Sequence, residues 1–128
     1  MADLGLLIIR LMFGLTMAGH GAQKLFGWFG GHGLKGTAGF FESIGIRPGK
    51  MMALLAGLAE LVGGLLFAVG AWIPVASFLF IVTMLVAIVK VHGKNGYWAT
   101  EGGIEYNVAY IAVAIGLALT GPGAYSLF

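Results

Sequence analysis

The chain has 128 residues, of which 59% are apolar and only 9% are charged, with 23 glycines, no cysteine and a formal net charge of +2. An ordinary soluble domain carries about 25% charged residues, and a small one needs that charge to cover its surface. The composition therefore excludes a nucleic-acid binder, a disordered chain and a disulfide-stapled secreted domain, and it indicates an integral membrane protein.

Four apolar segments are long enough to form membrane-spanning helices, which need about 20 residues each. They cover residues 4–22, 51–71, 72–89 and 104–120. The first contains Arg10 and His20, the second contains Glu60, and the third carries no charge. The sequence therefore predicts an all-α fold in a single domain over residues 1–128, an integral membrane four-helix bundle with four transmembrane helices.

The first loop, residues 23–50, is rich in glycine and aromatic residues and differs from an ordinary solvated connector. Its apolar spacing predicts a short interfacial helix over Thr37–Ile44, and an irregular connector is the alternative. Within this loop, Gly31–Gly36 matches the G-x-G-x-x-G dinucleotide fingerprint. That fingerprint requires a preceding strand, which this sequence does not predict, so we interpret the match as chance.

The basic residues are distributed unevenly along the chain. Six of the seven lie in or beside the first and third loops: Lys24, Lys35, Arg47, Lys50, Lys90 and Lys94. Four spans place these two loops on one side of the membrane, and the positive-inside rule makes that side cytoplasmic. Loops 23–50 and 90–104 are therefore predicted to be cytoplasmic, with both termini outside.

The first two spans each carry a stripe of residues at helical spacing. The first consists of Arg10, Phe13, Gly14, Met17, His20, Gly21 and Lys24, and the second of Ala53, Ala56, Gly57, Glu60, Gly63 and Gly64. Small residues let helices approach closely and ionisable residues avoid lipid, so both stripes are predicted to pack inward. Counting from the span ends places Arg10 near the depth of Glu60, which predicts a buried pair between them. The alternative is that this pair only fixes helix register.

Further ionisable residues lie near the predicted cytoplasmic edge. They are His20 and Lys24 on the first span, His92 after the third, and Glu105 with Tyr106 at the start of the fourth. Imidazoles and carboxylates that converge from three helices can relay protons to a quinone or hold a metal. A di-iron site would need Glu-x-x-His pairs, which the sequence lacks, so no metal site is predicted. The alternative is that these helix-end residues are simply hydrated.

Several short patterns occur in order along nearly the whole chain. They are Gly19–Gly27 (GHGAQKLFG), Gly36–Phe41 (GTAGFF), Ala59–Gly64 (AELVGG), Lys90–His92 (KVH) and Glu105–Asn107 (EYN). Together they resemble the DoxX family. The resemblance implies a four-helix membrane protein of oxidoreductase type, similar to membrane subunits linked to quinol and thiosulfate oxidation. The polar positions of the family correspond to Arg10, His20, Lys24, Glu60, His92 and Glu105.

The functional prediction is an inner-membrane protein of a bacterium or archaeon that binds a quinone or another small hydrophobic ligand. It would support electron or proton transfer with a redox-protein partner, and if it is itself an enzyme it is a quinone-linked membrane oxidoreductase. The predicted catalytic residues are His20, His92 and Glu105, and the predicted ligand-binding residues are Arg10, Lys24, Glu60 and Tyr106. The alternatives are a scaffold subunit and a small transporter. A homo-oligomer through small residues such as Ala112 and Gly116 also stays open.

Overall fold

The computed structural model describes residues 1–98, 100 and 103–125, without the side chains of Val91, His92 and Lys94. Its α-helices are α1 (Ala2–Phe26), α2 (Gly33–Ser43), α3 (Gly49–Val69), α4 (Ile73–Ala87) and α5 (Glu105–Thr120). Short 3-10 turns cover Trp28–Gly30 and Gly93–Asn95, and a π-helical turn, Ile88–His92, continues α4. The described part of the chain contains no strand, which confirms the all-α fold class.

Among the described residues, three helical segments are long and apolar enough to cross a membrane: Ala2–Phe26, Gly49–Val69 and Ile73–Lys90. The fourth predicted span forms α5, an apolar helix of 16 residues that is shorter than these three. The helix expected at Thr37–Ile44 is present as α2, and it begins four residues earlier than predicted.

The ends of the long helices follow from local backbone chemistry. Helix α1 runs past the predicted limit at Ala22 and stops at Gly27, whose φ of 74° is left-handed and whose N–H bonds the carbonyl of Gln23. Helix α3 stops in the same way at Gly70, with φ of 75°. Glycine adopts this conformation without a steric penalty, so both helices end where the sequence supplies it. Pro74 then lies in the first turn of α4, where it removes no intrahelical hydrogen bond.

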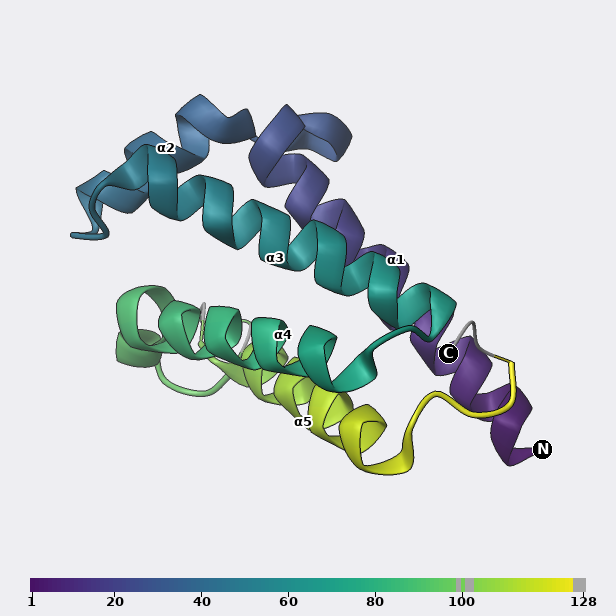
Figure 1. Ribbon diagram of the computed structural model, residues 1–128. Coiled ribbons are helices and arrows are strands. Elements are labelled where there is room, and N and C mark those ends of the chain that lie inside the picture. The colour runs from purple at the N-terminus through teal and green to yellow at the C-terminus, as the bar shows by residue number, and fades with distance from the viewer. Residues whose placement is uncertain (99, 101–102, 126–128) are drawn as a thin grey trace.

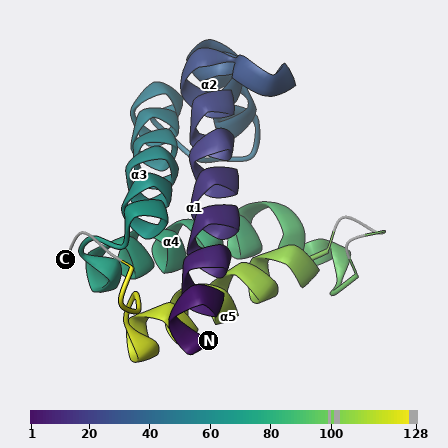
Figure 2. The ribbon, with the colours of Figure 1, turned by 90° about the vertical axis from the view of Figure 1, so that its right-hand side faces the viewer.

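The helices are arranged as two pairs (Figure 1). Helices α1 and α3 run side by side, α2 packs against the end of that pair, and α4 packs with α5. A view turned by 90° shows the second pair crossing the first (Figure 2). Both views place the closest approach of the two pairs at the end away from α2.

An aromatic cluster holds the two pairs together at that end. Phe13 of α1 lies with its ring centroid 5.1 Å from that of Phe67 on α3 and 5.4 Å from that of Phe80 on α4. Phe67 and Phe80 are stacked with centroids 5.4 Å apart. The same buried cluster also contains Met17 of α1, Ile73 and Ala76 of α4, and Ala114 and Leu117 of α5. Aromatic pairs at these distances add attraction beyond simple burial, so the cluster fixes the junction of the pairs.

Helices α1 and α3 pack backbone against backbone. A methyl group added at Gly14 would overlap the backbone of Gly64 and Ala68, and one added at Gly21 would lie 2.6 Å from the carbonyl oxygen of Gly57. Only glycine permits this approach, as in other membrane helix pairs built on small residues. The prediction that the two stripes pack inward is confirmed.

We expect Gly14→Ala and Gly21→Ala to lower the melting temperature of the protein in detergent. The added methyl group has to push α1 away from α3, and overpacking of this kind costs about 1–3 kcal/mol. Gly19→Ala is the matched control, because it lies on the same helix and its added methyl group would meet open space. Its melting temperature should be unchanged or raised, since alanine favours a helix over glycine by up to about 1 kcal/mol. Equal melting temperatures for Gly14→Ala and Gly19→Ala would contradict this packing.

Candidate functional site

A buried ion pair links the two long helices of the first pair. Lys24, in the last turn of α1, donates a hydrogen bond from Nζ to Oε1 of Glu60 on α3. The Glu60 side chain is 3% exposed and the Lys24 side chain is 27% exposed. The protein thus encloses the Glu60 carboxylate, while part of the Lys24 side chain stays accessible.

The predicted pair between Arg10 and Glu60 is wrong, because the carboxylate is bound by Lys24 instead. The glycine contacts place Glu60 level with His20, which is ten residues, or about 15 Å along the axis, from Arg10. Helical side chains also lean toward the N-terminus of their own helix. In this antiparallel pair Lys24 and Glu60 lean toward one another, whereas Arg10 leans away.

The Arg10 guanidinium binds the segment that follows α5. Its Nη1 and Nη2 donate to the carbonyl oxygens of Pro122 at 2.5 Å and Tyr125 at 2.6 Å. In the first turn of α1, Asp3 accepts a hydrogen bond from the backbone N–H of Ala124 at 3.0 Å. Arg10 is only 1% exposed, so these carbonyls replace the water that a guanidinium would otherwise bind. Arg10 therefore attaches residues 122–125 to the first helix.

The loop after α1 folds back over the end of that helix. Gln23 donates from Nε2 to the carbonyl of Phe29 at 3.2 Å, and its Oε1 lies 3.1 Å from a ring nitrogen of His20. The hydroxyl of Thr37 on α2 donates to the carbonyl of Lys24 at 3.5 Å. These contacts hold the loop and α2 beside the ion pair.

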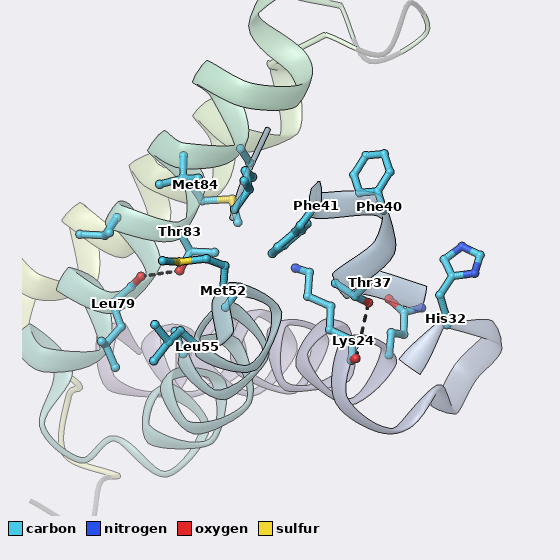
Figure 3. A pocket seen from close by; sticks show the side chains of 18 of the residues that line it. Lys24, His32, Thr37, Phe40, Phe41, Met52, Leu55, Leu79, Thr83 and Met84 are labelled. Atoms are coloured by element: carbon cyan, nitrogen blue, oxygen red, sulfur yellow. Dashed lines mark hydrogen bonds between the residues drawn. The ribbon is translucent and has the colours of Figure 1, made fainter. Parts of the chain in front are cut away.

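A cavity of about 740 Å³ lies between the first helix pair with α2 on one side and α4 on the other (Figure 3). Its walls come from α1 and the following turn, α2, the α2–α3 loop, α3 and α4: Gln23, Lys24, Gly30, Gly31, His32, Thr37, Phe40, Phe41, Ile46, Met52, Leu55, Ala56, Ala59, Phe78, Leu79, Val82, Thr83, Met84, Val86 and Ala87. It occupies the space that opens where the two pairs diverge, and its volume lies within the usual range for small-molecule sites.

The cavity is polar near the end of α1 and apolar toward α4. Figure 3 shows the Lys24 amine directed toward Phe41, with Thr37 beside it and His32 farther out. The wall from α4 is mostly apolar, and the hydroxyl of Thr83 is engaged with the carbonyl of Leu79 at 2.8 Å. Such a site accommodates a molecule with a small polar group and an apolar body.

The structure brings together only some of the predicted site residues. Lys24 lines the cavity, Glu60 binds Lys24, and His20 reaches the lining through Gln23. Arg10 lies at the opposite end of α1. Glu105 begins α5, next to an exposed Tyr106 whose ring stacks on that of Tyr110. The side chain of His92 lies outside the described residues.

Several lining residues were not anticipated from the sequence. His32 occurs in the glycine-rich pattern interpreted as a chance match, and Gln23, Thr37 and Thr83 were not singled out as site residues. The dense aromatic residues of loop 23–50 were the available signal, because Phe40 and Phe41 do line the cavity. Among the described residues, no group of three or more histidine or acidic side chains is placed to hold a metal ion.

The long apolar helices and the buried charge between them define a multi-pass helical membrane protein, whose surroundings are the lipid bilayer. The sequence profile of the DoxX family matches residues 5–93, and the chain belongs to this family.

Two relatives match over most of the chain. The Bacillus subtilis protein named Putative oxidoreductase CatD is 33% identical over 119 residues, which cover 93% of this chain and 81% of CatD. The Mycobacterium tuberculosis protein named Uncharacterized membrane protein Rv3486 is 30% identical over 129 residues, which cover 93% of this chain and 76% of Rv3486. No solved structure matches the chain.

A double-mutant cycle in detergent melts should show that Glu60 is coupled to Lys24 and not to Arg10. Lys24→Met should destabilise the protein by up to about 3–5 kcal/mol, because it leaves the enclosed carboxylate without its partner. Glu60→Gln should destabilise it less, because the ammonium that it leaves is partly exposed. Their combination should be clearly less destabilising than the sum of the single effects. Glu60→Gln with Arg10→Met is the control pair and should be additive. Additivity for Lys24 with Glu60 would contradict the observed ion pair.

Proposed function

We propose that the chain binds a quinone-like or other small hydrophobic molecule in the cavity beside Lys24 and supports electron or proton transfer in a membrane oxidoreductase assembly. The cavity itself is the main support for this proposal, because it is largely apolar and has one paired charge at its polar end. Family membership and the oxidoreductase name of CatD are consistent with it.

The proposed roles follow from the positions of the side chains. Lys24 donates a hydrogen bond to an oxygen of the bound head group, and Glu60 holds the ammonium in place. Reduction of a quinone takes up two electrons and two protons; the electrons come from a redox-protein partner. His20, His92 and Glu105 are proposed to pass protons between the cavity and the cytoplasmic side. Arg10 and Tyr106 are left out of this site, because Arg10 binds residues 122–125 and Tyr106 is exposed.

Filling part of the cavity should weaken binding without disturbing the ion pair. Val82→Trp places a large ring in the lining, and Leu85→Trp is the matched control on the same helix, exposed to a similar degree and outside the lining. Titration of the purified protein with a short-chain ubiquinone should give saturable binding to the parent chain and to Leu85→Trp. Binding to Val82→Trp should be weaker by roughly tenfold or more, because the indole ring takes up space in the cavity that the ligand would occupy. Absence of saturable binding to the parent chain would refute the proposal in favour of a scaffold.

We propose that loops 23–50 and 90–104 face the cytoplasm of a bacterial or archaeal cell, with both termini outside, as the distribution of basic residues favours. The chain has no cysteine, so single introduced thiols report their own location. An impermeant maleimide should label Ala124→Cys in intact spheroplasts and Ser43→Cys only after lysis; both positions are exposed. Labelling of Ser43→Cys in intact spheroplasts would reverse the topology.

A further inference from the structure

The charge that faces the cavity is already balanced from within the protein. Of the lining residues, which all belong to the described part of the chain, Lys24 is the one lysine, arginine or acidic side chain. Its ammonium binds the carboxylate of Glu60, which is enclosed behind it. A ligand in the cavity therefore meets a neutral pair and not a free positive charge.

The polar end still offers a hydrogen-bond donor. An ammonium carries three N–H groups, and the bond to Glu60 uses one of them. Gln23 already donates to the Phe29 carbonyl, and the hydroxyl of Thr37 donates to the carbonyl of Lys24. A ligand that accepts a hydrogen bond from Lys24 uses a second of the three N–H groups of that ammonium.

A negatively charged head group would be penalised at this position. It would approach Lys24 but also the Glu60 carboxylate bound to the same nitrogen, and the three groups together would carry a net negative charge. Like charges repel strongly where little water screens them, and Glu60 is almost fully enclosed. An uncharged carbonyl oxygen accepts the same hydrogen bond without adding charge to the site.

We infer that the Lys24–Glu60 pair makes this cavity selective for amphiphiles with an uncharged, hydrogen-bond-accepting head group, such as a ketone or quinone carbonyl, over carboxylates of the same chain length. The apolar walls from α3 and α4, which include Met52, Leu55 and Val82, receive the tail in either case. The inference rests on the proposed function, since it assumes that the cavity holds a ligand.

The test compares two probes of matched length, 2-tetradecanone and tetradecanoate, by native mass spectrometry of the protein released from detergent at pH 8. The parent chain should bind the ketone at least about tenfold more tightly than the carboxylate. Glu60→Gln keeps the shape of the side chain and leaves the Lys24 charge unbalanced, so the ratio should shift toward the carboxylate by at least about tenfold. Val82→Trp, which blocks the cavity, should weaken the binding of both probes.

A double variant tests whether a changed ratio in Glu60→Gln comes from the altered charge or from a folding defect. Lys24→Gln combined with Glu60→Gln replaces the ion pair by two amides and keeps the site neutral, so it should retain the preference for the ketone. A parent chain that binds both probes equally, or the carboxylate more tightly, would overturn the inference, as would an unchanged ratio in a folded Glu60→Gln protein. If the parent chain binds neither probe, it is the proposed function that fails.

Discussion

The close contact of α1 with α3 determines which charged residues of the chain meet. Glycines at the interface let the two backbones touch, and this contact sets the antiparallel register. In that register Lys24 and Glu60 lean toward each other, while Arg10 is directed to the other end of the helix. Glu60 lies near the middle of α3, where an ionised side chain is costly to place in a membrane, so its lysine partner relieves a substantial penalty. The ion pair follows from the backbone contact, and the polar end of the cavity follows from the ion pair.

The cavity exists because the two helix pairs meet at one end and diverge at the other. Phe13, Phe67 and Phe80 fill the junction, whereas the space between the pairs at the other end is left as the cavity. Each pair has its own internal polar contact: Lys24 with Glu60 in the first, and the hydroxyl of Ser77 with a carbonyl of α5 in the second. The walls of the cavity therefore belong to two helix pairs, each stabilised by its own internal contact. The angle between the two pairs sets the width of the cavity.

The sequence predicts the helices and their buried faces well, because a period of 3.6 residues appears directly in the spacing of Arg10, Gly14 and Lys24. It predicts the partner of Glu60 poorly. Depth was counted from the ends of apolar segments, whereas the register depends on which glycines touch, and α1 extends beyond its apolar stretch to Phe26. The placement of His32 in the cavity wall depends on a loop that folds back over α1, and the divergence of the pairs depends on a crossing angle. Neither of these can be read from residue spacing.

The attachment of residues 122–125 to Arg10 can form only late in the synthesis of the chain. A chain made from its N-terminus presents Lys24 and Glu60 to the membrane within its first three helices, so this pair can neutralise itself before α4 is made. Arg10 enters with α1, yet both carbonyls that it binds lie beyond α5. Until α5 has been inserted, the buried guanidinium lacks these two acceptors. Insertion of the final helix thus completes the hydrogen bonding of the first, which links the stability of α1 to the synthesis of nearly the whole chain.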